Sequence, residues 1–299
     1  MHWIAIVNPA SGGGLSTRVQ NQINKHLSKL TSEIYVTKYP GHATELVQAH
    51  STAEAIAIVG GDGTLFECLG GINGDTPRLS IIPSGTGNSL AQDMGILTWR
   101  QGISNCLDGV ERTVDTIGIT YLLEDGRSAR CHCASTTGLG YPSNAVVLGN
   151  RRLKKLGRYC YPVSGVIQSF LGNRISGNIL IDGIKIDASD LKGIFINNTQ
   201  FAGNFRAFPE AEYDDGLFDV LCMHVGPLRQ NLQNILVLNE NYSYMPSHNY
   251  RAKKLHIELD TPLPLMLDGE IIEGVVDVKF VIESKAITCI IPNSTVFNA

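Results

Sequence analysis

The stretch AIAIVGGDGTLFECL, residues 55–69, decides how the rest of the chain is interpreted. It opens with five uninterrupted apolar residues, which is typical of a strand buried on both faces of a sheet. Glycines and an aspartate follow at residues 60–63, and the apolar spacing after them predicts a helix over about residues 65–69. A glycine turn here would aim backbone N–H groups and the positive end of the helix dipole at one point, which suits a phosphate. The alternative is a plain Gly-Asp turn that caps a helix.

The same order of strand, glycine turn and helix occurs on both sides of this stretch. Residues 3–7 predict a strand before NPASGGG (residues 8–14), and a helical stripe through Val19, Ile23 and Leu27 follows. Residues 79–82 predict a strand before PSGTGN (residues 83–88), with a helix from about Ser89. A further strand over 34–37 and a short helix over 43–50 lie between them. Such repetition predicts a parallel α/β sheet, whose ligands bind at the carboxyl ends of the strands. We therefore expect the three turns to form one phosphate cradle.

The pattern changes after about residue 113, where alternating apolar and polar segments separated by turn residues predict antiparallel strands. These segments cover residues 113–123, 130–136, 179–186, 193–197, 218–225, 254–260 and 276–282, with helices expected at about 153–171 and 228–238. The expected fold is an α/β N-terminal domain with a mainly parallel sheet (residues 1–116) and a β-rich, mainly antiparallel sandwich (residues 117–285). The last residues, 286–299, could complete the first domain.

Composition and charge exclude several classes of protein. The 299 residues are 43% hydrophobic and 17% charged, which excludes a disordered chain, collagen and a coiled coil. The net charge of −4 argues against a general nucleic-acid binder. The seven cysteines form no C-x-x-C pair and are interpreted as reduced thiols of a cytoplasmic protein. The sequence predicts neither a secretion signal nor a transmembrane segment.

Four motifs resemble one known family. NPxSG at residues 8–12, GGDGT at 60–64, PxGTxN at 83–88 and DGE at 268–270 are similar to those of the diacylglycerol kinase catalytic domain family, which includes bacterial lipid kinases, sphingosine kinases and ceramide kinase. GGDGT is shared with NAD kinases, whereas the combination is particular to the lipid kinases. The resemblance covers essentially the whole chain. It implies a fold of the NAD kinase/diacylglycerol kinase type and transfer of the γ-phosphate of ATP, with Mg²⁺, to the hydroxyl of a lipid alcohol such as diacylglycerol. The alternatives are a sphingoid base or another glycerolipid as substrate, an NAD kinase, and a silent lipid- or nucleotide-binding protein.

The resemblance also implies site residues by position. The nucleotide site carries over to Asn8, Pro9, Ser11, Gly12, Thr37, Gly60, Gly61, Asp62, Gly63, Thr64, Glu67, Gly85, Thr86 and Asn88. The catalytic residues carry over to Glu270, as general base, with Asp268 and Asp62. A structural Mg²⁺ carries over to Glu212 (through its carbonyl), Asp215 and Leu217. From the residues alone, Asp268-Gly269 is equally a common hairpin turn, and the acidic segment 209–219 is equally a solvated turn.

Ser89 departs from the family pattern, which has aspartate there. In bacterial members this aspartate belongs to an acidic, metal-linked network with the positions of Asp62 and Asp115. Losing one carboxylate weakens a Mg²⁺ site, although sphingosine kinases also carry a small residue at this position. Ser89 therefore bears on the substrate class more than on the reaction.

A basic cluster precedes a mostly uncharged, apolar stretch at residues 159–171. A basic rim beside an apolar helix suits an anionic membrane surface, and the alternative is a packed helix with a solvated end. We expect a lipid substrate at a membrane surface, no nucleic acid, and a cytoplasmic protein that is at most peripheral to the membrane; a homodimer is left open. The cluster comprises Arg151, Arg152, Lys154, Lys155 and Arg158.

Overall fold

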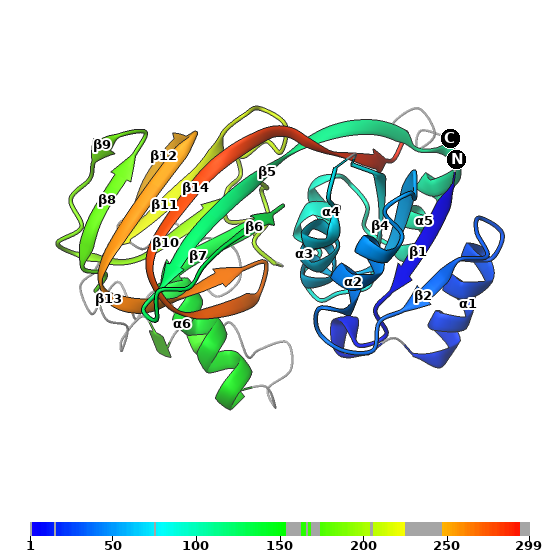
Figure 1. Ribbon diagram of the computed structural model, residues 1–299, viewed down its shortest axis with the longest axis horizontal. Coiled ribbons are helices and arrows are strands. Elements are labelled where there is room, and N and C mark those ends of the chain that lie inside the picture. Colours follow the sequence, from blue (N-terminus) through cyan, green and yellow to red (C-terminus); the bar gives the residue numbers. More distant parts are fainter. Residues whose placement is uncertain are drawn as a thin grey trace.

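The computed structural model describes residues 2–14, 16–74, 76–153, 163–165, 167–168, 174–203, 206–224 and 247–293. Figure 1 shows two parts side by side, joined by two strands that run through both. The first part holds β1 (Trp3–Val7), a 3₁₀ turn η1 (Ser11–Gly13), α1 (Thr17–Leu27), β2 (Ile34–Val36), α2 (His42–Ala49), β3 (Ala55–Gly60), α3 (Asp62–Gly71), β4 (Arg78–Pro83), α4 (Ser89–Asp93) and α5 (Trp99–Asp108).

The second part is built mainly from strands. It holds β5 (Val110–Leu123), β6 (Ser128–Cys133), β7 (Thr136–Gly140), α6 (Tyr141–Leu148), a π-helical turn η2 (Gly149–Leu153), β8 (Gly177–Ile181), β9 (Ile184–Lys185), β10 (Leu191–Asn197), β11 (Phe218–His224), β12 (Ser247–Ala252), β13 (Lys254–Leu267) and β14 (Glu270–Ile291). None of the helices in the described part of the chain combines the length and the apolar character needed to cross a membrane.

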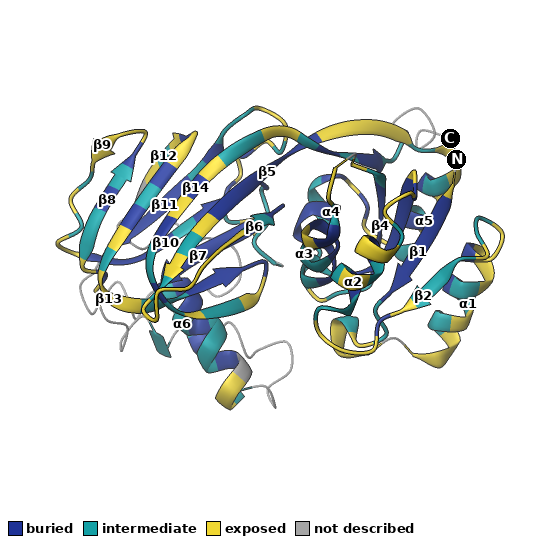
Figure 2. Ribbon diagram, in the orientation of Figure 1, coloured by how far each residue is buried: buried dark blue, intermediate teal, exposed yellow. Residues whose placement is uncertain are grey.

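The parallel sheet of the first part has the strand order β4-β3-β1-β2. Its two central strands are buried along their whole length, as Figure 2 shows for β1. Successive residues of β1 alternate between two cores: Ile4 and Ile6 pack with α2, α3 and α4, and Ala5 and Val7 pack with α1 and α5. Burial on both faces explains why these strands are apolar without interruption.

The antiparallel strands of the second part enclose a large apolar core. Their order is β12-β11-β10-β7-β13-β14, with β5 and β6 beside β14 and the β8–β9 hairpin beside β13. Buried residues from β5, β6, β7, β10, β11, β13 and β14 meet in this core, including Phe218 and Phe280. The expected fold class, a mainly parallel α/β part followed by a β-rich antiparallel part, is confirmed.

The two parts share β5 and β14. The start of β5 pairs with Ile287–Ile291 of β14, and its second half pairs with residues 275–283 of the same strand. Near its end β14 also pairs in parallel with β4, Thr288 opposite Arg78. The boundary expected after residue 116 thus lies inside a continuous strand. All the strands therefore form one hydrogen-bonded network, which fixes the second part against the first.

Several predicted elements need correction. The segment 179–186 is the β8–β9 hairpin, which turns at Asp182 and Gly183 with φ angles of 47° and 81°. The segment 130–136 is broken between β6 and β7. The helix expected from residue 153 is preceded by α6, which the sequence did not predict, and α5 was missed as well. Of residues 153–171, only 153, 163–165 and 167–168 are described, and 228–238 lie wholly outside the described residues.

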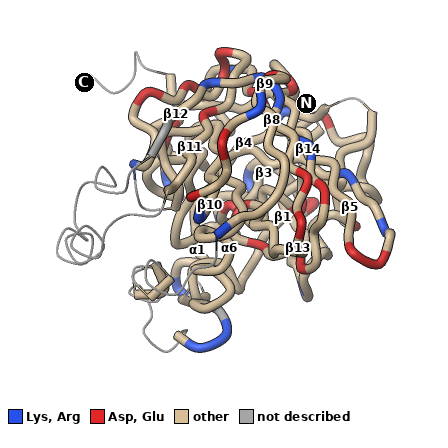
Figure 3. The backbone as a smooth tube through the Cα atoms, turned by 90° about the vertical axis from the view of Figure 1, so that its left-hand side faces the viewer, with Lys and Arg blue, Asp and Glu red and all other residues tan. Residues whose placement is uncertain are grey.

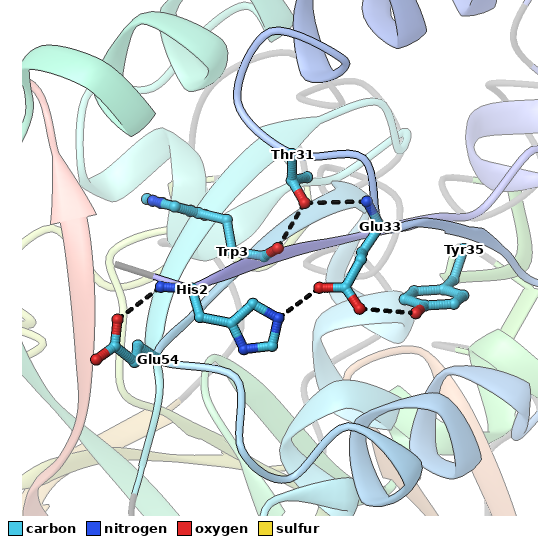
Figure 4. Close-up of polar contacts among 6 residues, drawn as sticks. All are labelled: His2, Trp3, Thr31, Glu33, Tyr35 and Glu54. Carbon is cyan, nitrogen blue, oxygen red and sulfur yellow. Dashed lines mark hydrogen bonds and ion pairs between the residues drawn. The ribbon is translucent and has the colours of Figure 1, made fainter.

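A polar network ties the amino ends of β1, β2 and β3 together (Figure 4). The His2 backbone N–H donates to Glu54 Oε2 at 2.6 Å, and its imidazole Nε2 bonds Glu33. The Tyr35 hydroxyl donates to Glu33 Oε1 at 3.4 Å, and the Thr31 hydroxyl donates to the carbonyl of Trp3 at 2.6 Å. The network therefore lies at the amino ends of the strands, whereas the glycine turns follow their carboxyl ends.

Candidate active site

The three glycine turns lie against one another at the carboxyl ends of β1, β3 and β4. A Cβ atom added to Gly61 would lie 2.9 Å from Gly85 Cα and 3.4 Å from Ser11 Oγ. Gly12 has a φ of 64°, and a Cβ there would overlap the Ser84 carbonyl oxygen. Side chains at these positions would push the turns apart. The backbones therefore meet because the residues are glycines.

Two asparagine side chains hold the shape of these turns. Asn8 Nδ2 donates to the Thr64 hydroxyl at 2.9 Å, and its Oδ1 accepts from Ala10 N at 3.0 Å. Asn88 brackets Gly85, since its Oδ1 accepts from Gly85 N at 2.9 Å and its Nδ2 donates to the Gly85 carbonyl at 2.8 Å. Both amides are thus used within the loops, and the turns are fixed before any ligand binds.

Helix α3 begins at Asp62, directly after the central turn. The first N–H groups of a helix have no partner inside it, and they carry the positive end of the dipole. Pro9 lies half-buried in the first turn and Thr86 is exposed in the third. The carboxyl ends of these strands are therefore rich in backbone N–H donors and offer few side chains. Such an arrangement suits phosphate oxygens.

Two further residues predicted at the nucleotide site lie beside α2. Thr37 is buried, and its N–H donates to the Val7 carbonyl at 2.9 Å, so it continues β2 next to the first turn. Glu67 Oε2 accepts from Ala43 N at 3.1 Å, and the Thr44 hydroxyl donates to the Glu67 carbonyl at 2.7 Å. Glu67 therefore joins α3 to the first turn of α2 and supports the wall beside the turns.

The hairpin between β13 and β14 brings a carboxylate to the glycine turns. Leu267 pairs with Glu270, and the two residues between them, Asp268 and Gly269, have φ angles of 46° and 93°. Positive φ at both central residues is the geometry of a tight two-residue hairpin. The exposed Glu270 side chain extends toward α3, where a Cβ on Gly63 would lie 3.5 Å from Glu270 Oε1. A residue of the second part thus reaches the helix start of the first.

Asp268 points the other way and anchors the hairpin. Its buried carboxylate accepts from the Ser135 hydroxyl at 2.5 Å, from Thr136 N at 2.8 Å and from Ala134 N at 3.2 Å. Its own N–H donates to the Thr136 carbonyl at 2.8 Å. Burial raises the pKa of Asp268, although these hydrogen bonds oppose the shift. The aspartate of the DGE motif therefore holds the turn that presents Glu270.

Asp62 lies between the turns and this hairpin. Its Oδ1 accepts from Ser89 N at 2.7 Å, and the Ser89 hydroxyl lies 3.4 Å from its Oδ2. Burial, and next the negative charge of Asp268, raise the pKa of Asp62 to about 7. A Cβ on Gly87 would lie 2.7 Å from Asp62 Oδ2, so a glycine there makes room for the carboxylate. The negative charge of Asp268 disfavours the charged form of Asp62, so a cation beside Asp62 would be stabilised.

Comparison with known proteins agrees with this arrangement. Residues 2–119 match the family model of the diacylglycerol kinase catalytic domain. Residues 2–119 are thus similar to a diacylglycerol kinase catalytic domain. The resemblance expected from the motifs is confirmed, and the chain is a phosphotransferase of the lipid kinase type.

Relatives and solved structures of this kinase extend over most of its length. The diacylglycerol kinase of Staphylococcus carnosus is 25% identical over 277 residues, which cover 89% of this chain and 87% of that protein. The sphingoid long-chain bases kinase 1 of Arabidopsis thaliana is 28% identical over 253 residues, 75% of this chain and 32% of that protein. The fold matches the crystal structure of a diacylglycerol kinase from Bacillus anthracis str. Sterne with a TM-score of 0.75 and 22% identity, covering 98% of each chain.

The carboxylate of this lipid kinase that was expected to hold a structural Mg²⁺, that of Asp215, is already engaged. Asp215 Oδ1 accepts from Leu217 N at 2.9 Å, and its Oδ2 forms an ion pair with Arg251. The residues present thus do not fit a cation held by Asp215. Glu212 lines a pocket of about 210 Å³ together with Asp93, Gln200, Ala211, Tyr213 and Asp214.

Asp115 has a structural role in the same region. This fully buried carboxylate accepts from Gly216 N at 2.6 Å and from Lys285 N at 2.6 Å. Both bonds go to backbone groups, which ties the acidic segment to β14. Its oxygens therefore join the acidic segment to β14, and neither of these bonds involves Asp62.

A set of contacts that the sequence did not predict joins α4 of the kinase domain to the segment after β10. The Ser89 hydroxyl accepts from Gly203 N at 2.9 Å, Gln92 Nε2 donates to the Gly203 carbonyl at 3.1 Å, and Asp93 Oδ2 accepts from Gln200 N at 2.9 Å. Burial raises the pKa of Asp93 to about 6. We call these contacts the α4 latch. The sequence signal for the α4 latch is Ser89, where the residue departs from the family pattern.

Proposed function

We propose that this lipid kinase transfers the γ-phosphate of ATP to the hydroxyl of a lipid alcohol, with diacylglycerol as the first candidate. The position of Glu270 carries the proposal. Its carboxylate comes from the second part of the chain and lies at the start of α3, beside the glycine turns of the first part. A base on one side and backbone phosphate donors on the other are the two requirements of such a transfer.

The proposed reaction follows from these positions. The backbone N–H groups of the turns and the start of α3 hold the phosphate oxygens of ATP. Glu270 accepts the proton of the lipid hydroxyl while the hydroxyl oxygen forms a bond to the γ-phosphorus. The bond between that phosphorus and the β–γ bridging oxygen breaks, and ADP is released.

Asp62 is the residue we propose for Mg²⁺, with Asp268 behind it. Its oxygens are the hard donors that Mg²⁺ prefers. Burial, and next the negative charge of Asp268, raise the pKa of Asp62, and the positive charge of a bound cation would offset both effects. When bound, Mg²⁺ would neutralise charge on the phosphoryl oxygens. Asp62 would orient it through the oxygen that does not accept from Ser89 N.

The membrane side of the site is proposed from the basic end of the segment formed by α6 and η2. Arg151 Nη2 lies 2.8 Å from Glu273 Oε1, on the strand that follows Glu270, so this end lies beside the hairpin. Arg152 is exposed in the same turn, whereas Lys154, Lys155, Arg158 and residues 159–162 lie outside the described residues. An anionic membrane at this point would present a lipid hydroxyl close to Glu270.

The test is a transfer assay with γ-labelled ATP, Mg²⁺ and a panel of lipid alcohols in mixed micelles. Label in phosphatidic acid supports the proposal, and label in a sphingoid base phosphate keeps the reaction but changes the acceptor. Label in NADP, with NAD supplied in the same panel, would show an NAD kinase. Tight ATP binding without transfer to any acceptor would show a silent binding protein.

A further inference from the structure

A group of metal-ligating side chains lies outside the proposed active site, on the solvent-facing side of the β13–β14 pair. His256 and Glu258 alternate along β13 with the buried residues Leu255 and Ile257, so both face away from the core. Asp277 of β14 stands directly opposite Glu258 in the antiparallel register. The group is at the end of β13 remote from the hairpin, and Figure 3 shows acidic residues in the neighbourhood of both strands.

The ligand atoms of these three residues converge. His256 Nε2 lies 2.8 Å from Asp277 Oδ2 and 3.9 Å from Glu258 Oε1, and the three atoms lie within 4.8 Å of one another. A tetrahedral Zn²⁺ with bonds of about 2.1 Å separates its ligands by roughly 3.4 Å. These separations bracket that value, and the side chains are only partly buried, so small side-chain rotations would complete the set.

The charges around the group favour a cation. Like charges placed directly opposite on neighbouring strands destabilise a sheet, and Glu258 and Asp277 are such a pair. Within the described residues their ion-pair partner is the His256 imidazole, and Lys279, opposite His256 in the register, forms no ion pair with either carboxylate. At least one negative charge therefore remains uncompensated.

A neighbouring strand also orients one ligand. Asn178 of β8 stands opposite Glu258, and its Nδ2 donates to Glu258 Oε2 at 3.3 Å. That bond leaves Oε1 facing the imidazole. Hydrogen bonds that hold the second oxygen of a carboxylate ligand are a regular feature of metal sites.

We propose that His256, Glu258 and Asp277 bind a divalent first-row transition-metal ion, represented by Zn²⁺, with water completing its coordination. One imidazole with two carboxylates suits such an ion, whereas Mg²⁺ prefers oxygen ligands alone. The ion cross-links β13 to β14 far from Glu270 and stabilises the sheet. The site is therefore separate from the proposed phosphoryl transfer.

The test uses the full chain, freed of metal with a chelator and then titrated with ZnCl₂ and with CoCl₂. We expect one equivalent of Zn²⁺ to bind at this group and to raise the melting temperature. His256→Gln and Glu258→Gln should each weaken that binding tenfold or more. The Co²⁺ complex should lack the intense thiolate charge-transfer band that cysteine ligands would give.

The control variant is His132→Gln. His132 lies on β6, where its Nδ1 is 2.8 Å from Glu283 Oε2, and it belongs to no group of three ligands among the described residues. Its Zn²⁺ affinity should equal that of the parent. Glu258→Gln changes an exposed side chain and should fold even if His256→Gln does not. Unchanged Zn²⁺ affinity in Glu258→Gln, a thiolate band with Co²⁺, or no saturable binding would each overturn the proposal. Kinase activity plays no part in these readouts.

Discussion

The two sides of the proposed active site differ in where their contacts come from. On the glycine side, turns that follow neighbouring strands of one sheet touch through bare backbone, as Gly61 does with Gly85. On the hairpin side, the position of Glu270 depends on Asp268, whose carboxylate bonds Thr136, 132 residues earlier in the chain. The first side is therefore built where neighbouring strands of one sheet end, and the second by hydrogen bonds to a strand 132 residues away in the chain. Changes on the first should affect nucleotide binding, and changes on the second should affect turnover.

Gly61→Ala should have the largest effect on the glycine side. Its Cβ would meet the Gly85 backbone at 2.9 Å, so the turns must separate, and misplacement of about 1 Å at such a site costs about 100-fold in kcat/KM. The measurement is ATP affinity together with kcat/KM. Gly70→Ala in α3 is the matched control, because its Cβ would meet Thr44 Oγ1 at 3.7 Å, an ordinary contact. Equal ATP affinity and equal kcat/KM in the two variants would contradict the proposal that the three turns form one phosphate cradle.

Ser135→Ala should weaken the hairpin side. It removes the hydroxyl that donates to buried Asp268, which should lower the free energy of unfolding by about 1–3 kcal/mol. Because Asp268 positions Glu270 and not the turns, kcat should fall while ATP affinity stays unchanged. Urea unfolding, kcat and ATP titration measure this, with the exposed Ser128→Ala on β6 as control. A loss of ATP affinity without a loss of kcat would reverse the assignment of the two sides.

The sequence predicted the glycine side better than the hairpin side for the same reason. Strand, turn and helix follow one another within a few residues there, so GGDGT and PxGTxN carry their structural context with them. The DGE motif predicted the hairpin turn, but nothing near Asp268 in the sequence indicates Ser135 or Thr136. The latch contact of Ser89 with Gly203 is equally distant in the chain.

The missed elements have physical explanations of the same kind. Helix α5 begins with a capping box, in which Thr98 and Gln101 bond each other's backbone, and this signal was present in the sequence. Helix α6 follows β7 directly, without a capping side chain before it, and no element was predicted over residues 141–148. β13 and β14 extend far beyond their predicted segments because their bulges disturb the alternation of apolar and polar residues.

Asp93→Asn should change the dependence of stability on pH through the α4 latch. Burial raises the pKa of Asp93 from 3.8 to about 6, so the folded state favours the protonated carboxyl. That contribution is fully present below pH 3.8 and is lost as the pH rises to about 6. Asparagine keeps an acceptor for Gln200 N without the charge. The variant should therefore be more stable than the parent above pH 6, by about 1 kcal/mol after allowance for solvent screening, and equal to it near pH 4.

Thermal unfolding from pH 4 to pH 8 measures this difference. The exposed Asp108→Asn at the end of α5 is the control and should follow the parent curve. If Asp93→Asn also followed the parent curve at every pH, the carboxyl would not be buried in the latch.

His2→Ala should have the smallest effect. The bond to Glu33 raises the pKa of His2 above 6.5, and the bond from His2 lowers the pKa of Glu33 below 4.5. Their stabilisation is therefore greatest between about pH 4.5 and 6.5 and is lost as the pH rises through the pKa of His2 or falls through that of Glu33. Both groups are exposed, so the loss of melting temperature should be small. Turnover should not change, because the network lies at the amino ends of the strands, whereas the glycine turns follow their carboxyl ends.

The rate of phosphoryl transfer by Glu270→Gln tests most directly whether Glu270 of the hairpin side acts as the base beside the glycine turns. Glutamine keeps the size of the side chain and removes the base, so kcat should fall by about 10²–10⁴-fold while ATP affinity stays at the parent value. Glu111→Gln, an exposed carboxylate on β5 that pairs with Arg78, should keep nearly full turnover. A Glu270→Gln variant as active as Glu111→Gln would contradict the account.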